Sequence, residues 1–408
     1  MSNQNAAKET ETRGAGRSLE GVVIAHAALH GGMMSNFGRL FAARSVEEGA
    51  ELHFYASTEG VFGQPPPVEE LEAIGGVYHG VDFGRTPTFW RYLRGLVFLV
   101  REFRRRRVTI LHTRSMAMGL VGRIAGTIAL VPYIVHHQDD LHFRDESHGP
   151  LKRWFFKRFA QALSMLSDKT LFVSDAVLED AVAAGFNRKK CTNVGHDLSQ
   201  SFQRALRATE AAERVRHPML ERCGIPAGVP VIGCMARLAP LKGIDTLVAV
   251  AEKVCAEHPD CHFLVKGDGP SRDELMRDVE RRGLTGRVVF SFETIDADEL
   301  PQLIRSFDIL FLPTRREGFG MAFAEAMAMR VPVVGPRKPP VTEVVADCGI
   351  LITPEDVDGY ADALLRLLGD EALRQEIGSQ GYERAESEWM GTRAANRVID
   401  VYEELLER

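Results

Sequence analysis

The sequence contains little that is typical of secreted or membrane-spanning proteins. Its six cysteines form no CxxC pair and no cysteine/histidine spacing of a zinc site, so we expect buried free thiols in a reducing compartment. The longest apolar run, GLVGRIAGTIALVPYIV from Gly119, is interrupted by Arg123 and Pro132, which argues against a membrane span. Residues 1–18 have no apolar signal-peptide core, and we expect them to be a disordered tail.

Two other features are also missing. The formal net charge of −6 argues against a nucleic-acid partner, since such proteins are usually basic. The Asp-x-Asp spacing DAD at 296–298 precedes the helix-like segment ELPQLIRSFD, and helix capping accounts for it better than a metal does. We therefore expect a cytoplasmic protein that needs no metal.

Apolar, β-branched runs alternate with helix-length segments along most of the 408 residues. The predicted strands form two series, the first at 22–27, 51–57, 108–114, 132–138 and 169–174, the second at 229–238, 262–268, 288–292, 308–314 and 332–336. Continuous apolar strands of this kind indicate parallel sheets that are covered on both faces. The sequence thus predicts an α/β protein with two doubly wound, Rossmann-like domains facing a cleft, joined within the polar region 198–227.

The most unusual segment is EGFGMAFAEAMAMRVPVVG at 317–335, which places Glu317 and Glu325 in apolar surroundings. Gly318 and Gly320 allow a tight turn into a helix, whose positive end suits an anion or a sugar hydroxyl. Glu317 in the turn and Glu325 on the helix could face one pocket and accept hydrogen bonds from vicinal hydroxyls. Alternatively, Glu317 caps the helix and Glu325 faces solvent.

Two other loops follow predicted strands. In GCMARLAPLKGID, Arg237 and Lys242 could clamp a diphosphate and stabilise it as a leaving group without a metal, or could be surface charges. In HGGMMSNFG, Gly31 and Gly32 suit close approach to a phosphate, although a tight turn explains them equally well. The GxGxxG dinucleotide fingerprint is absent, which disfavours a nicotinamide dehydrogenase.

Together these segments resemble family 4 of the retaining glycosyltransferases, which have the two-domain GT-B fold. The residues that carry the resemblance are EGFGMAFAEAMAMRVPVV, the Arg237/Lys242 pair, KGDGP (266–270) and VSDAVLEDAVAAGF (173–186). Arg330 stands where the family commonly has glycine. The resemblance implies an N-terminal acceptor-side domain at 19–200, a nucleotide-sugar-binding domain at 201–380, and terminal helices at 381–408 that cross back to the first domain.

The resemblance also implies roles for individual residues. Arg237 and Lys242 would bind the donor diphosphate. Glu317 would contact the hydroxyls of the donor sugar, and Glu325 would hold the nucleotide ribose. The backbone of Gly318, Phe319 and Gly320 would assist Glu317, and Gly31 and Gly32 would line the phosphate side.

One departure concerns the N-terminal half of the site. The family often has a histidine after a strand in this region, but GRIAGTIALVPYIVHHQDDLHF has Asp139 at that position, with His136 and His137 just before it. Either His137 or Asp139 could orient the acceptor or an outer hydroxyl of the donor sugar. A histidine that simply hydrogen-bonds to backbone at the strand end is the structural alternative.

Two segments, 90–107 and 151–160, combine aromatic residues with many arginines. Residues Tyr92, Leu93, Leu96, Val97, Leu99, Val100 and Phe103 recur at helical spacing and predict a helix packed by one face. The cationic remainder could bind anionic lipid at the inner membrane face, or it could be a solvated surface.

We therefore expect a retaining transferase that moves a hexose or N-acetylhexosamine from a nucleotide-diphosphate sugar, a UDP-sugar first among them, to a glycan or a lipid-linked saccharide. No cofactor is expected beyond this co-substrate. Two alternatives stay open: a sugar-nucleotide epimerase of similar architecture, and a non-catalytic nucleotide-sugar-binding protein.

Overall fold

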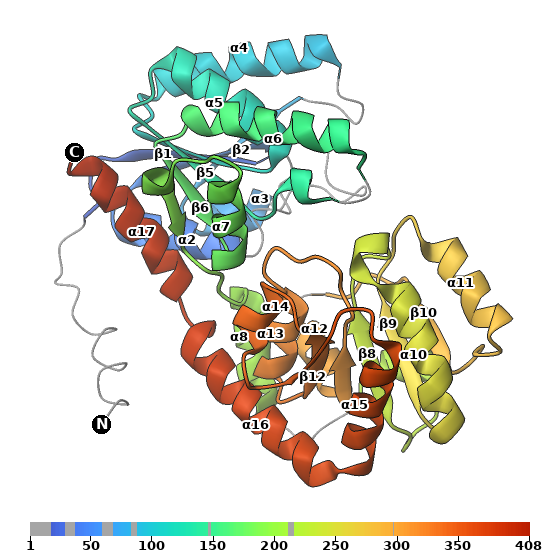
Figure 1. Ribbon diagram of the computed structural model, residues 1–408. Coiled ribbons are helices and arrows are strands. Elements are labelled where there is room, and N and C mark those ends of the chain that lie inside the picture. The colour runs from blue at the N-terminus through green and yellow to red at the C-terminus, as the bar shows by residue number, and fades with distance from the viewer. Residues whose placement is uncertain are drawn as a thin grey trace.

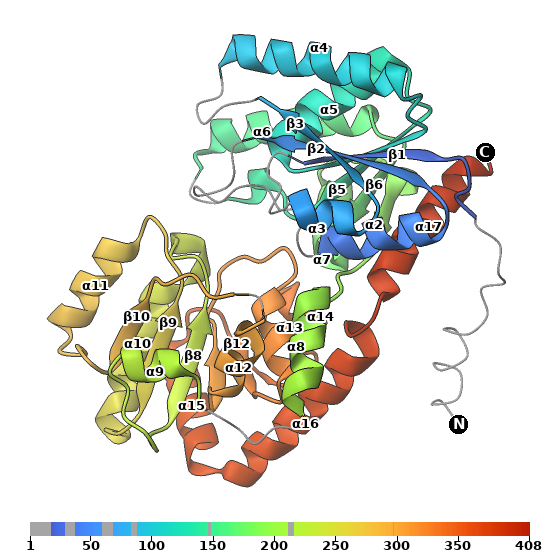
Figure 2. The same cartoon turned by 180° about the vertical axis from the view of Figure 1, so that it is seen from behind.

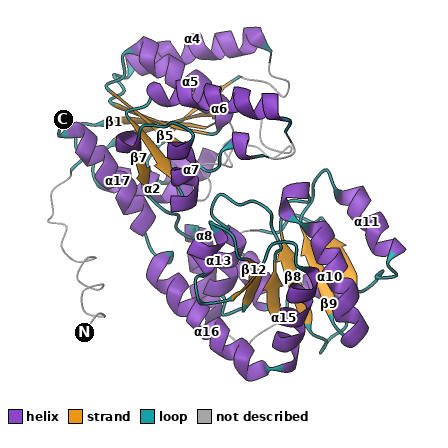
Figure 3. Ribbon diagram, viewed as in Figure 1, coloured by secondary structure: helices purple, strands orange, loops and turns teal. Residues whose placement is uncertain are grey.

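Two parallel sheets, one in each half of the chain, form the frame of the protein (Figure 1). The structure is a computed structural model that describes residues 18–28, 37–58, 68–82, 88–145, 148–210, 216–296 and 298–408. Figure 3 shows that each sheet lies between layers of helices. The predicted fold class, two doubly wound α/β domains, is confirmed.

The N-terminal sheet has the strand order β3-β2-β1-β4-β5-β6-β7, and every pair is parallel. Its strands are β1 (Val23–Ala28), β2 (Glu51–Ser57), β3 (Val77–Val81), β4 (Ile110–Arg114), β5 (Tyr133–Gln138), β6 (Lys169–Phe172) and β7 (Cys191–Asn193). Its helices are α2 (Phe37–Glu47), α3 (Val68–Ala73), α4 (Phe89–Arg105), α5 (Met116–Ala129), α6 (Pro150–Met165) and α7 (Asp175–Ala183). Helices α4, α5 and α6 lie on one side of this sheet, and α2 and the last helix of the chain, α17 (Arg393–Leu406), lie on the other (Figures 1 and 2).

The C-terminal sheet has the order β10-β9-β8-β11-β12-β13, again all parallel. Its strands are β8 (Val231–Met235), β9 (His262–Lys266), β10 (Val288–Ser291), β11 (Ile309–Phe311), β12 (Val333–Pro336) and β13 (Ile350–Ile352). The helices of this lobe are α8 (Gln200–Glu210), α9 (Pro218–Arg222), α10 (Ile244–Glu257), α11 (Arg272–Arg281), α12 (Leu300–Arg305), α13 (Met321–Ala328), α14 (Val341–Val345), α15 (Val357–Gly369) and α16 (Glu371–Glu388).

The chain crosses between the two lobes twice, and the crossings touch each other. Helix α8 packs into the C-terminal core through Phe202 and Leu206, whereas α17 returns to the N-terminal core and buries Tyr402. The carboxylate of Asp197 accepts hydrogen bonds from the first-turn amides of α17, at 3.0 Å from Ala394 N and 2.9 Å from Ala395 N. This bond pair stabilises the start of α17 where the chain crosses back.

The three strands absent from the sequence prediction, β3, β7 and β13, all lie at sheet edges. Edge strands are covered less completely than central ones, so VYHGV, CTN and ILI have no long apolar run. The expectation of six buried thiols is also only partly right, because Cys234 and Cys261 are buried and the other four are partly exposed.

Helix α4 differs from its predicted packing. Leu99 and Phe103 are buried, as expected, but Leu93 is 39% exposed and Val97 is 44% exposed. Both residues lie on the outer side of the helix. The predicted apolar face was therefore wider than the face that α5 covers.

Candidate active site

The loop between β11 and α13 lies where the two lobes meet. Gly320 is the N-cap of α13 with φ of 110°, a conformation that favours glycine, and no side chain caps the helix. The positive end of the α13 dipole is therefore not neutralised by a carboxylate. Glu317 does not cap the helix, which excludes one of the two interpretations of the sequence.

Glu317 instead pairs with Lys242. The Lys242 Nζ lies 2.6 Å from Glu317 Oε1, and the two side chains are 20% and 10% exposed. Lys242 ends a short 3₁₀ turn, and the following residue, Gly243, has φ of 66° and backs onto the carbonyl of Pro313, 2.0 Å from where a Cβ would be. Only glycine allows these two loops to approach closely enough for the pair.

Glu325 lies about one turn into α13, eight residues after Glu317, and is mostly buried. Burial raises the pKa of its carboxyl to about 7. Within the described part of the chain, no hydrogen bond or ion pair to this carboxylate is present. A buried carboxyl group without a partner is costly, and polar groups of a ligand would relieve that cost.

Arg237, the other predicted clamp residue, lies in a more exposed place than Lys242. It lies two residues beyond β8 and is exposed, and its guanidinium makes no hydrogen bond or ion pair with a described residue. In the described residues, no hydrogen bond or ion pair joins it to Lys242 or Glu317.

The N-terminal lobe contributes the end of β5. Asp139 is held by Arg114 in a two-pronged ion pair, with Nη2 to Oδ1 at 2.7 Å and Nε to Oδ2 at 3.0 Å. Burial by itself would raise the pKa of Asp139, but the Arg114 charge and hydrogen bonds outweigh it and hold that pKa well below its ordinary value. His137 is 1% exposed, its ring stacks near His112, and burial lowers its pKa to about 3. His137 is therefore neutral in the folded protein, and Asp139 is ionised.

The turn at Gly318 contacts the N-terminal lobe at two places, Ser174 after β6 and Asp139 after β5. Ser174 Oγ donates to the Gly318 carbonyl at 2.8 Å, and a Cβ on Gly318 would lie 2.2 Å from the Asp139 carbonyl oxygen. The ring of Phe319 lies 5.5 Å from that of His196, centroid to centroid. The turn thus fits against the N-terminal lobe at backbone distance.

Two further contacts join the lobes nearby. The Glu343 carboxylate accepts hydrogen bonds from the amides of Asp175 (3.0 Å) and Ala176 (2.8 Å), the first residues of α7. Arg316 Nη2 lies 2.9 Å from Asp140 Oδ2. Sequence analysis missed these cross-lobe residues, because nothing in their local pattern shows which distant segment they meet.

Three further expectations concern Gly31 and Gly32, a metal site and the DAD segment. Gly31 and Gly32 lie outside the described residues. In the described ranges, no three histidine, cysteine, aspartate or glutamate side chains are grouped as metal ligands. The capping role expected for DAD is wrong, since α12 begins after Glu299 without a side-chain cap.

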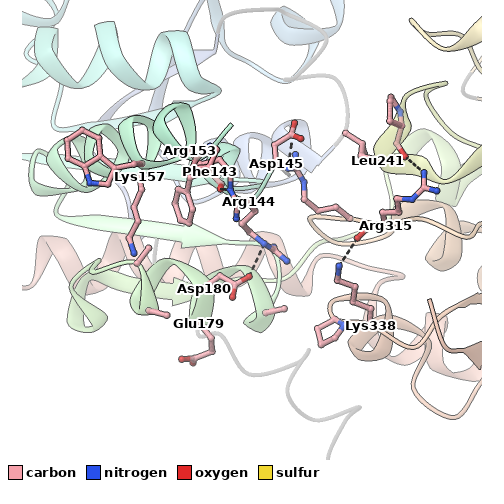
Figure 4. Close-up of a pocket in the computed structure, with 18 residues that line it drawn as sticks. Phe143, Arg144, Asp145, Arg153, Lys157, Glu179, Asp180, Leu241, Arg315 and Lys338 are labelled. Atoms are coloured by element: carbon pink, nitrogen blue, oxygen red, sulfur yellow. Dashed lines mark hydrogen bonds and ion pairs between the residues drawn. The ribbon is translucent and has the colours of Figure 1, made fainter. Parts of the chain in front are cut away.

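A cavity of about 1180 Å³ lies between the lobes beside this site (Figure 4). The predicted site residues do not line it, but Leu241 and Arg316, the neighbours of Lys242 and Glu317 in sequence, do. From the N-terminal lobe it is lined by the segment after β5, by α6 and by α7. No helix among the described residues has the length and apolarity needed to cross a bilayer.

Comparison with known families gives two matches, one for each lobe. Residues 31–195 match the glycosyl transferase 4-like domain, and residues 219–384 match the glycosyl transferases group 1 family.

Curated relatives agree with these matches. The chain is 27% identical over 296 residues to the alpha-D-kanosaminyltransferase of Streptomyces kanamyceticus, covering 70% of this chain and 73% of the relative. It is 27% identical over 315 residues to the sulfoquinovosyl transferase SQD2 of Arabidopsis thaliana, covering 74% of this chain and 57% of that one. A GDP-mannose-dependent alpha-(1-6)-phosphatidylinositol monomannoside mannosyltransferase of Mycolicibacterium smegmatis is 31% identical over 195 residues, or 46% of this chain and 50% of the relative.

Solved structures show the same fold. Anabaena HepE in complex with UDP and glucose superposes with a TM-score of 0.76 at 18% identity, over 94% of this chain and 100% of that one. Sucrose-phosphate synthase from Thermosynechococcus elongatus gives a TM-score of 0.72 at 18% identity, over 95% of this chain and 99% of that one. With a family match on each lobe and this shared architecture, the chain belongs to the glycosyltransferases of GT-B fold.

Proposed function

We propose that this glycosyltransferase transfers a hexose or N-acetylhexosamine from a nucleotide-diphosphate sugar, with retention of the anomeric configuration, as in family 4. A UDP-sugar is the first donor to test, because the neighbouring HepE structure contains UDP and glucose. The acceptor would be a glycan or a lipid-linked saccharide. The relatives named above are glycosyltransferases, which does not favour an epimerase or a non-catalytic binding protein.

The observation that carries the proposal is the Lys242–Glu317 pair beside the uncapped start of α13. A lysine and the positive end of a helix dipole favour a diphosphate at this point. When a donor binds, Lys242 breaks its ion pair with Glu317 and pairs with the diphosphate instead. Glu317 can then accept hydrogen bonds from the hydroxyls of the donor sugar. Glu325, which has no described partner, accepts hydrogen bonds from the hydroxyls of the ribose.

In the transfer step, the bond between the anomeric carbon and the diphosphate oxygen breaks, and the acceptor hydroxyl forms the new bond from the same face. Lys242 and the α13 dipole stabilise the negative charge that grows on the departing diphosphate. The acceptor proton passes to a diphosphate oxygen on that face. This front-face path requires no nucleophile from the protein.

For the N-terminal side, the proposal assigns the sugar contact to Asp139 rather than His137. The Asp139 side chain is 37% exposed and fixed by Arg114, whereas His137 is 1% exposed. His137 then packs behind Asp139 and keeps the end of β5 in place. Arg237, which is exposed, is the second cation that we propose for the diphosphate.

We also propose that α4 and α6 rest on an anionic membrane surface. Phe89, Trp90 and Leu151 are 74%, 69% and 79% exposed, and Phe155 is 58% exposed. Figure 1 shows both helices on the same outer side of the N-terminal lobe. Arginines and lysines of the same helices, among them Arg91, Arg94, Lys152 and Arg158, supply positive charge for lipid headgroups.

A thermal-shift screen against UDP-, GDP-, ADP- and TDP-sugars tests the donor assignment. We expect one nucleotide class to raise the unfolding midpoint, because a ligand that binds only the folded state stabilises it. No shift with any of these donors would contradict the proposal.

A further inference from the structure

The cavity between the lobes has an imbalance of charge that the donor site does not explain. Its lining includes six basic side chains and three acidic ones: Arg144, Arg153, Lys157, Arg315, Arg316 and Lys338, against Asp145, Glu179 and Asp180. In Figure 4, Arg153 and Lys157 come from the N-terminal side, and Arg315 and Lys338 come from the opposite side.

The three carboxylates already have arginine partners. Asp180 lies 2.9 Å from Arg144 Nε, and Asp145 lies 3.7 Å from Arg316 Nη1. Glu179 pairs with Arg188, which does not line the cavity. The acidic side chains of the lining are therefore already neutralised and do not pair with its remaining cations.

Arg315 is also neutralised, because it pairs with Asp245 and Glu355 at 2.7 and 2.8 Å, outside the lining. Of the six cations, Arg153, Lys157 and Lys338 have no carboxylate partner in the described structure. Arg153 donates to the Phe143 carbonyl at 3.1 Å, and Lys338 Nζ donates to the Arg315 carbonyl at 3.0 Å.

These three positive charges belong to both lobes and face a space that is large for a sugar alone, since pockets for small ligands measure roughly 300–1,000 Å³. Apolar surface lies among them, contributed by Phe143, Trp154 and Leu241, with prolines at 150, 240 and 339. Such a lining suits a ligand that has a strong anion at one place and a sugar or hydrocarbon face at another.

We propose that this cavity is the acceptor subsite and that it selects acceptors carrying a phosphate group. Arg153 and Lys157, one turn apart on α6, bind the phosphate, Lys338 on the opposite wall adds positive charge, and the ring of Trp154 packs against the neutral part of the acceptor. Lysine suits phosphate as a point charge, and arginine adds directed N–H donors. The assignment of the phosphate-bearing molecule as the acceptor rests on the proposed glycosyl transfer; the anion-binding role of the cavity does not.

The phosphate could belong to a soluble sugar phosphate or to a lipid phosphate, and two probes separate these sources. Glucose 6-phosphate and decyl phosphate are each titrated with the protein and followed by ³¹P line broadening, with glucose and decanol as neutral competitors. We expect both phosphates to bind and neither neutral compound to displace them. Tighter binding of decyl phosphate would indicate a lipid source, and tighter binding of glucose 6-phosphate a soluble one.

The test variant is Arg153→Gln/Lys157→Gln/Lys338→Gln. We expect it to weaken phosphate binding by about tenfold or more, since three exposed charge pairs together are worth about that factor. A matched control removes three exposed cations elsewhere, Lys189→Gln/Arg277→Gln/Arg366→Gln, and should bind as the parent does. The charge-preserving variant Arg153→Lys/Lys157→Arg/Lys338→Arg should retain most of the affinity.

Phosphate binding in the cavity can be distinguished from donor binding at Lys242. Lys242→Ala should reduce the thermal shift with the donor but leave ³¹P broadening by the phosphate probes intact. Equal phosphate binding by the Gln variant and the parent, or a loss of phosphate binding only in Lys242→Ala, would overturn the assignment of the cavity. Failure of every donor in the screen, with phosphate binding preserved, would instead count against the proposed function.

Discussion

Lys242 Nζ and Glu317 Oε1 lie 2.6 Å apart, although 75 residues separate them in sequence. Both side chains are mostly buried, so each is the principal neutralising partner of the other when no donor is bound. The pair is therefore a preformed charge arrangement that a diphosphate sugar would divide between its phosphates and its hydroxyls.

The first prediction concerns this pair without ligand. Lys242→Met leaves the Glu317 carboxylate without its cation in a mostly buried place, and we expect a loss of about 1–3 kcal/mol in the free energy of unfolding. Thermal or chemical denaturation measures the change.

Lys253→Met is the matched control, because its ion pair with Asp358 is exposed, at 51% and 79% for the two side chains. That variant should cost less than about 0.5 kcal/mol. An equal loss of unfolding free energy in Lys242→Met and Lys253→Met would show that the buried ion pair stabilises the fold no more than the exposed one.

The second prediction concerns pH. The folded-state pKa of Glu325, about 7, lies above its ordinary value of 4.5, so the folded protein binds the extra proton between these pH values. Stability from this group is present below pH 4.5 and falls as the pH rises through the window to 7, by up to about 3 kcal/mol. Glu325→Gln cannot ionise, and we expect it to be more stable than the parent at pH 8 and similar at pH 4.

Unfolding midpoints of parent and variant across pH 4–8 provide the measurement. Glu257→Gln, at an exposed position, should follow the parent at every pH. A stability difference between Glu325→Gln and the parent that does not change with pH would rule out the raised pKa as its cause.

The third prediction concerns the contact at Gly318. A methyl group there would meet the Asp139 carbonyl at 2.2 Å, so Gly318→Ala must push the turn away from the N-terminal lobe. Displacing catalytic groups by about 1 Å can cost on the order of a hundredfold in rate, and we expect kcat/KM for transfer to fall by at least about tenfold.

The comparison variant is Gly369→Ala, where a Cβ meets nothing within 4 Å. It should keep parental kcat/KM. If Gly318→Ala also keeps it, the close fit of the turn does not matter for catalysis.

The fourth prediction concerns the membrane. The parent should float with vesicles rich in phosphatidylglycerol at low salt and remain unbound with neutral phosphatidylcholine vesicles, because the charges on α4 and α6 act over about 10 Å at 0.1 M salt. Phe89→Ser/Trp90→Ser should reduce flotation strongly.

Met276→Ser serves as its control, because Met276 is also exposed, at 44%, but lies on α11 of the other lobe. No flotation of the parent at low salt would remove the membrane proposal.

Much of the fold could be predicted from the sequence, because central parallel strands carry long apolar runs. The prediction for β2 (Glu51–Ser57) matches the structure residue for residue, and β5 and β9 are found within a few residues. The edge strand β3, by contrast, is half exposed, and its VYHGV has no such run. An apolar run in the sequence indicates a strand that is buried on both faces. An edge strand is not buried in this way, so its sequence has no such run.

The candidate site was predictable where its chemistry is local. The glutamate and the two glycines of EGFG stand close together in sequence, so the turn and the helix that follows could be inferred. Ser174 and Glu343 were not, because each meets a backbone group of the other lobe, Ser174 at Gly318 and Glu343 at the start of α7. The balance between His137 and Asp139 depended on burial and on Arg114, which no spacing rule reveals.

The most direct test of the central claim is isothermal titration of the best donor from the nucleotide-sugar screen with the parent protein, Lys242→Ala and Glu325→Ala. The account predicts that each substitution weakens donor binding by about tenfold or more, since each removes a charge-assisted contact worth roughly 1.5–3 kcal/mol. Donor affinities of both variants equal to that of the parent would contradict it.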